Sequence, residues 1–113
     1  MIKNQTRNFV IIKKSKLCKS IFSKARGFMF FFKKPDYALA FIFNCEVRAE
    51  LHMMFVFFPI DVLFLDKSKK VVDIKKNFKP FCYYAPKVRS QYVIELPAGF
   101  AGKTRIKDRI IMK

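Results

Sequence analysis

The chain contains no tryptophan, three glycines and one histidine among its 113 residues. So few glycines leave no G-x-G-x-x-G turn and no P-loop, the glycine-rich signatures that hold nucleotide phosphates. A G-x-S-x-G elbow, which presents the nucleophile of many serine hydrolases, is absent as well. A conventional enzyme is therefore poorly supported, and we expect no cofactor.

Cysteine is also scarce. Cys18, Cys45 and Cys82 are far apart and odd in number, and no C-x-x-C pair is present. This spacing argues against a zinc site or a thioredoxin-like motif, and no metal site is expected. Isolated cysteines in apolar stretches behave as small core residues, and a reducing compartment suits them. We therefore predict a cytoplasmic protein.

Long uninterrupted apolar runs are missing. The most apolar stretch, from Leu51 to Leu65, is interrupted by His52, Pro59 and Asp61. It is shorter and more polar than the run of about 20 apolar residues that crosses a membrane as a helix. The sequence predicts no membrane span.

Acidic residues are few: 8 Asp+Glu stand against 24 Lys+Arg, which gives a net charge of +16. Residues 1–34 hold eight lysines, two arginines and no acid, which is +10. A surplus of this size attracts polyanions. Lysine outnumbers arginine by 18 to 6, and this ratio favours phosphate contacts over base recognition. We predict a nucleic-acid or ribonucleoprotein partner.

The candidate polyanion-binding residues are the lysines of the N-terminal third: Lys13, Lys14, Lys16, Lys19, Lys24, Lys33 and Lys34. Further lysine groups occur at 67–70 and 75–79. Alternatively, these side chains are a solvated surface that protects sheet edges from aggregation.

Apolar and aromatic residues are abundant: hydrophobic residues make up 52% of the chain, and 15 residues are phenylalanine. This supplies the core of a single domain covering residues 1–113. β-branched and alternating patterns predict strands at 9–13, 37–43, 60–65, 70–75, 90–96 and 108–112. We expect residues 16–18 to continue or pair with the first strand, and residues 44–46 to form a turn.

Two short helices are expected. One begins at Ser20, a good N-cap, and ends at Gly27, and the other begins at Pro97 and continues through Ala101. The resulting fold class is mainly β: a single-domain β-sandwich or jelly-roll-like barrel with two short helices.

Three stretches, in matching order and spacing, carry a family resemblance. They are Ala25-Arg26-Gly27-Phe28-Met29-Phe30, the segment from His52 to Asp66 with its Pro59-Ile60-Asp61, and the segment from Tyr92 to Phe100. Together they resemble the uncharacterised family called domain of unknown function 192, or uncharacterised protein family 0127. The resemblance implies a compact, mainly β domain of sandwich or jelly-roll type. It implies no established reaction, cofactor or ligand.

The chain departs from the family pattern at several positions. The family's usual tryptophan falls at His52, and its frequent basic residues fall at Phe31 and Met54. A glycine that often precedes the final aspartate is replaced by Lys107. If the absent polar groups serve a shared pocket, its polar chemistry is weaker here.

Arg26, Asp61 and Glu95 are the polar residues at the centres of the three motifs. In one interpretation they converge on a pocket, with Asp61 and Glu95 as an acid/base pair and Arg26 binding an anion. In the other, Arg26 forms a structural ion pair with a carboxylate, because polar groups within apolar strands need partners.

Two other candidates are the single histidine and a pair of tyrosines. His52 has apolar neighbours and no metal-ligand spacing, so a hydrogen-bonded core histidine is favoured over a catalytic one. Tyr83 and Tyr84 lie between Lys79 and Lys87 and could stack on exposed bases, although an ordinary surface loop is favoured.

The function predicted from the sequence is a small non-enzymatic binding module that contacts RNA or ribonucleoprotein through a basic face. The alternative is a small-molecule or carbohydrate-binding pocket around Arg26, Asp61 and Glu95, with or without weak hydrolytic activity. The oligomeric state stays open, and an assembly subunit is a third possibility.

Overall fold

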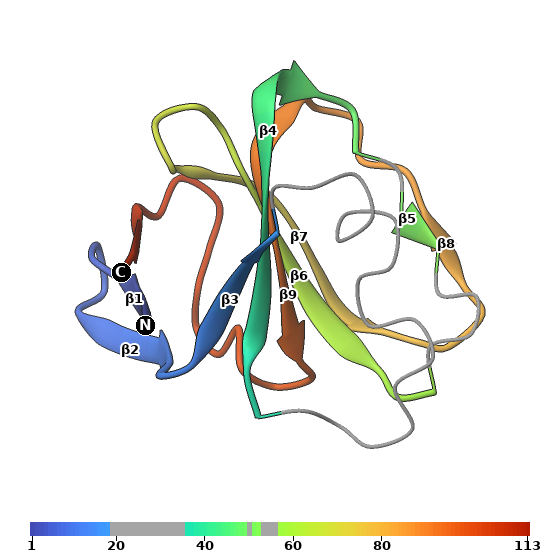
Figure 1. Ribbon diagram of the computed structural model, residues 1–113, viewed down its shortest axis with the longest axis horizontal. Helices are drawn as coiled ribbons and strands as arrows, with labels where there is room; N and C mark the ends of the chain where they lie inside the picture. Colours follow the sequence, from blue (N-terminus) through green and yellow to red (C-terminus); the bar gives the residue numbers. More distant parts are fainter. Residues whose placement is uncertain (19–35, 50, 53–56) are drawn as a thin grey trace.

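The structure, a computed structural model, describes residues 1–18, 36–49, 51–52 and 57–113 (Figure 1). These residues form strands and connecting turns. The strands are β1 (Ile2–Asn4), β2 (Phe9–Ile12), β3 (Ser15–Cys18), β4 (Ala38–Val47), β5 (Leu51–His52), β6 (Ile60–Leu65), β7 (Val71–Phe78), β8 (Tyr83–Tyr84), β9 (Ser90–Pro97) and β10 (Ile110–Met112). The predicted β fold is confirmed.

A five-stranded sheet in the order β3-β4-β9-β6-β7 forms the centre of the molecule. Strand β3 runs parallel to β4, and the other neighbours are antiparallel. All six residues of β6 are buried, as expected for a strand with packing on both faces. The last part of the apolar run, Ile60–Leu65, is therefore an interior strand that lies between β9 and β7.

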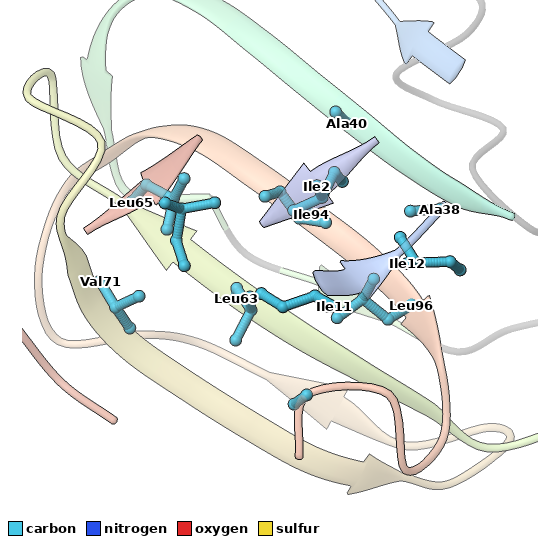
Figure 2. Packing of buried hydrophobic residues seen from close by; sticks show 12 residues of the cluster. Ile2, Ile11, Ile12, Ala38, Ala40, Leu63, Leu65, Val71, Ile94 and Leu96 are labelled. Atoms are coloured by element: carbon cyan, nitrogen blue, oxygen red, sulfur yellow. The ribbon is translucent and has the colours of Figure 1, made fainter. Parts of the chain in front are cut away.

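Each face of this sheet carries its own core. On one face the side chains of Ile94, Leu96, Leu63 and Leu65 pack against the isoleucines of a second, three-stranded sheet ordered β10-β1-β2 (Figure 2). We call this the isoleucine core. The opposite face carries a second core that includes Phe41, Val62, Phe64, Phe78 and Val93. We call this the phenylalanine core, and Tyr84 of the β5–β8 pair packs against it.

The two chain ends meet in the three-stranded sheet, where β1 lies between β2 and β10. The N-terminal amine of Met1 donates a hydrogen bond to the carbonyl oxygen of Lys113 at 2.6 Å. Ile2 and Ile110 are buried in the isoleucine core. The small sheet thus closes one face of the large sheet with residues from both ends of the chain (Figure 1).

Three expectations about the elements are wrong. Residues 97–101 form tight turns instead of a helix, and no helix occurs among the residues described here. Residues 44–46 lie within β4 instead of a turn. Residues 16–18 belong to β3, which pairs with β4 and not with the strand at residues 9–12. The helix expected from Ser20 to Gly27 lies outside the described residues.

Candidate functional site

The carboxylate of Asp61 is buried in the middle of the fold and binds three backbone amides. The residue is only 2% exposed to solvent. Oδ1 accepts a hydrogen bond from the N–H of Asn77 at 2.9 Å. Oδ2 accepts hydrogen bonds from the N–H groups of Gly99 and Ala101, both at 3.0 Å. The three donors supply the partners that burial of a carboxylate requires.

Local backbone geometry explains why these amides are available. Between the pairs Ile60↔Phe78 and Val62↔Lys75, β7 has one residue more than β6, which is a β-bulge. Asn77 lies in this bulge with a φ of 50°, and its N–H turns to Asp61. On the other side of Asp61, Gly99 has a φ of +92°, which interrupts helical geometry and lets the turn wrap the carboxylate.

Glu95 lies on the opposite face of the sheet from Asp61. In the β6–β9 register Asp61 pairs with Leu96, whereas Glu95 pairs with Val62. Paired residues share a face, so Asp61 lies on the side of the isoleucine core and Glu95 on the side of the phenylalanine core. The structure does not bring the two carboxylates together.

The surroundings of Glu95 fit this placement. Burial raises the pKa of the Cys18 thiol, the negative charge of Glu95 raises that pKa further, and the charge of Lys16 lowers it. Cys18 belongs to the phenylalanine core, so the Glu95 charge acts on that face. The third member of the candidate set, Arg26, lies outside the described residues.

A second buried carboxylate, Asp108, joins the two ends of the chain. Its Oδ2 accepts hydrogen bonds from Asn4 Nδ2 at 3.0 Å, Arg7 Nε at 2.7 Å and the backbone N–H of Arg105 at 2.9 Å. Asn4 Nδ2 also lies 3.1 Å from Thr104 Oγ1. The network crosses about a hundred positions of sequence and ties β1 to the segment before β10.

These contacts set the charge state of Asp108. Burial by itself would raise the pKa of its carboxyl group. The hydrogen bonds from Asn4, the Arg105 backbone and Arg7, together with the positive charge of Arg7, outweigh burial and hold the pKa below its ordinary value of 3.8. Asp108 is therefore an anion at neutral pH. Sequence reasoning did not select it, because its partners lie near the other chain end.

Lys107, which stands where the family often has glycine, adopts a φ of 78°. Its N–H donates a hydrogen bond to the carbonyl of Val71 at 2.7 Å, which fixes this conformation. Left-handed geometry costs a non-glycine residue about 1–2 kcal/mol. Lys107 is therefore strained.

Substituting Lys107 by glycine is expected to raise the free energy of unfolding by about 0.5–1 kcal/mol. The relief of left-handed strain exceeds the extra chain entropy that glycine adds to the unfolded state. Urea unfolding measures the change. Lys107→Ala is the matched control, since it removes the same charge and keeps the strain; an equal gain in both variants would contradict this explanation.

The candidate lysines of the N-terminal third are placed only in part. Lys13 is exposed, Lys14 forms a 3.1 Å ion pair with Asp36, and Lys16 lies over the ring of Tyr37 at 5.1 Å. Both partners of the ion pair are largely exposed, so it contributes little to stability. The remaining members, Lys19, Lys24, Lys33 and Lys34, lie outside the described residues.

A further group of cations surrounds the C-terminal loop of residues 102–109. Arg109 forms a β-bridge with Lys70. The N–H of Lys107 donates a hydrogen bond to the carbonyl of Val71, which follows Lys70 in the chain. Within the loop, cations at 103, 105, 107 and 109 are exposed, and the carboxylate of Asp108 is buried beneath them. We call Lys70, Lys103, Arg105, Lys107 and Arg109 the C-terminal basic cluster. Four cations at alternate positions were the signal in the sequence that our prediction missed.

The two tyrosines of β8 have different environments. Tyr83 is 62% exposed. Tyr84 donates its hydroxyl to Asp73 Oδ2 at 2.6 Å and packs at 5.9 Å from the Phe64 ring. Burial, the hydrogen bond to Asp73 and the charge of Asp73 raise the pKa of Tyr84 to about 12. Tyr84 is thus a partner of the core, and the two rings do not form one stacking platform. His52 pairs with Tyr83 across β5 and β8.

Residues 1–18, 36–49, 51–52 and 57–113 contain no group of three or more histidine, cysteine or acidic side chains arranged to hold a metal ion. The same residues include no helix with the length and apolarity needed to cross a membrane.

The fold and the site define a β domain in which the motif carboxylate Asp61 binds the backbone of its own chain. The chain belongs to the DUF192 family, described as Uncharacterized ACR, COG1430, whose model matches residues 3–110. This confirms the resemblance drawn from the three motifs.

Relatives agree with this assignment. The UPF0127 protein PH1112 of Pyrococcus horikoshii is 42% identical over 101 residues, covering 88% of this chain and 85% of its own. The UPF0127 protein TK1120 of Thermococcus kodakarensis is 36% identical over 110 residues, covering 96% of this chain and 69% of its own. A crystal structure of a Novosphingobium aromaticivorans protein of unknown function has a TM-score of 0.78, with 21% identity over 87% of this chain and 74% of that chain. This last likeness shows the shared fold.

Proposed function

We propose that the protein is a non-enzymatic binding module that contacts RNA through the C-terminal basic cluster. The observation that carries the proposal is the arrangement around Asp108. Four exposed cations alternate along one loop, and Lys70 is bridged to the last of them, Arg109, while the carboxylate of Asp108 is buried and already holds its own partners. The charge of the cluster is therefore available to an external anion.

The physical basis is phosphate contact. Lysine and arginine side chains that neutralise phosphates release counterions, and this release supplies most of the sequence-independent affinity for nucleic acids. The net charge of +16 attracts the polyanion from a distance. No hydrolytic step is assigned to Asp61, since its oxygens accept three backbone hydrogen bonds. For that reason we favour RNA binding over the alternative of a pocket around Asp61.

The test compares the salt dependence of RNA binding between two charge-matched variants. One replaces Lys70, Lys107 and Arg109 with glutamine, and the control replaces Lys79, Lys87 and Arg89, which are exposed elsewhere. Binding of a short fluorescent single-stranded RNA is followed by anisotropy at increasing salt. Loss of three phosphate contacts should reduce the slope of log K against log salt by about 2 in the first variant.

The control variant should keep the slope of the original protein. Absence of RNA binding at low salt, or an equal loss of slope in both variants, would contradict the proposal. A double-stranded DNA of equal length is measured beside the RNA. Tighter binding of the DNA would show that RNA is not the ligand.

A further inference from the structure

A groove follows strand β2, on the side of the molecule where the three-stranded sheet ends. It has a volume of about 410 Å³, and it is lined by residues 10–14 along β2 and beyond it, with Asp36 and Phe100 as the facing walls. Pockets that bind small molecules and cofactors range from about 300 to 1,000 Å³. The groove is therefore large enough for a short chain segment.

Strand β2 has one neighbour in its sheet. The order β10-β1-β2 leaves β2 at the edge. Among the described residues, β2 pairs with β1 alone, through Ile2↔Ile12, Lys3↔Val10 and Asn4↔Phe9. An edge strand presents a row of backbone donors and acceptors, which an added strand can pair with.

The lining combines apolar surface with positive charge. Val10 is 45% exposed and Phe100 is 39% exposed, so apolar side chains face the groove. The two lysines of the lining, Lys13 and Lys14, directly follow the last residue of β2. The single carboxylate of the lining, Asp36, is paired with Lys14. The charge around the groove is complementary to an anionic partner.

The far wall of the groove depends on Asp61. Phe100 lies between Gly99 and Ala101, and both of their amides are held by Asp61 Oδ2. The family motif that contains Asp61 therefore positions an exposed aromatic ring opposite the edge strand. The buried carboxylate thus influences the position of a side chain at the surface.

We propose that the edge of β2 and its groove bind an extended peptide segment of a partner protein in which acidic and apolar residues alternate. The peptide adds to the sheet as a strand beside β2. Because side chains alternate along a strand, its apolar residues face Val10 and Phe100, and its acidic residues face the lysines. RNA lacks the backbone groups that pair with a strand edge, so a peptide is the better occupant.

The probe is a fluorescein-labelled seven-residue peptide in which glutamate and valine alternate. Saturable binding is expected by anisotropy, together with slower hydrogen exchange of amides within Phe9–Lys13. Phe100→Ala should weaken binding about tenfold, because it removes buried apolar area. Lys13→Glu should weaken it about tenfold through charge reversal.

Matched control variants distinguish binding in the groove from binding that depends only on the net charge or on any exposed phenylalanine. Lys87→Glu changes the net charge equally, and Phe81→Ala removes an exposed phenylalanine that lies outside the groove. Both should bind the peptide as the original protein does. A peptide that alternates lysine and valine should not bind.

Three results would overturn the proposal: no binding of the glutamate–valine peptide, equal weakening by the control variants, or binding without protection of the β2 amides. The outcome is independent of the proposed RNA contact. The RNA test changes Lys70, Lys107 and Arg109, none of which lines the groove.

Discussion

Replacing Asp61 by asparagine is expected to lower the free energy of unfolding by about 3 kcal/mol, the largest effect among the polar residues of the family motifs. Hydrogen bonds to a charged group contribute about 1.5–3 kcal/mol each, and a buried donor without an acceptor adds a penalty of about 1–3 kcal/mol. An asparagine side chain keeps one acceptor oxygen and turns an NH₂ group toward amides that are themselves donors. At least one of the amides of Asn77, Gly99 and Ala101 loses its partner.

Urea unfolding followed by circular dichroism measures the change. Asp36→Asn is the control, because it removes the same charge from a carboxylate that is exposed and paired only at the surface. Its unfolding free energy should change by less than about 0.5 kcal/mol. If Asp61→Asn were as stable as the control, the carboxylate would not hold the bulge and the turn as described.

Replacing Asp108 by asparagine is expected to lower the free energy of unfolding by about 2–3 kcal/mol at pH 7 and to flatten its dependence on pH in acid. The folded-state pKa of Asp108 lies below its ordinary value of 3.8. A depressed carboxyl pKa contributes stability that is fully present above the unfolded-state pKa. That contribution is lost as the pH falls through the folded-state pKa.

The measurement compares unfolding free energies from pH 7 down to about pH 3. The original protein and the Asp108→Asn variant should differ most at neutral pH, and their curves should converge below about pH 4. Asn4→Ala, which removes one donor to Oδ2, should raise the pKa of Asp108 and move the acid loss of stability to higher pH. A constant difference at every pH would contradict the assigned ionisation.

Strands were predictable where the side-chain pattern was local and strong. The alternation of Tyr92, Ile94 and Leu96 placed them on one face, and the structure confirms this in the isoleucine core. The same pattern could not relate Asp61 to Glu95. Their relative orientation depends on the register between two strands, and a shift of one residue would have put both side chains on the same face.

The helix predicted after Pro97 shows where a local rule failed. Proline at the first position and a small-residue run favour a helical turn. In the structure the amides of Gly99 and Ala101 bind a carboxylate nearly forty positions earlier in the chain. Local propensity is worth a fraction of a kcal/mol per residue, and the two hydrogen bonds from this turn to a buried carboxylate outweigh it.

The sequence identified Asp61 as a candidate residue, but it did not predict the contacts that this residue makes. Asp61 was selected because a carboxylate in an apolar strand must have partners, and the structure supplies three of them. Asp108 was not selected, since its donors Asn4 and Arg7 come from the other end of the chain. The C-terminal basic cluster was not predicted, because Asp108 stands among its cations in the sequence, whereas residues 1–34 contain no acid.

The sequence by itself determined the family, the β class of the fold and one interior strand of its sheet, because apolar periodicity and three spaced motifs are local properties of the chain. Only the tertiary structure decided which groups meet. Strand register placed Asp61 and Glu95 on opposite faces, and closure of the chain ends buried Asp108 beneath its cations. Hydrogen bonds between distant segments depend on how the strands pair, and that pairing is a property of the whole fold.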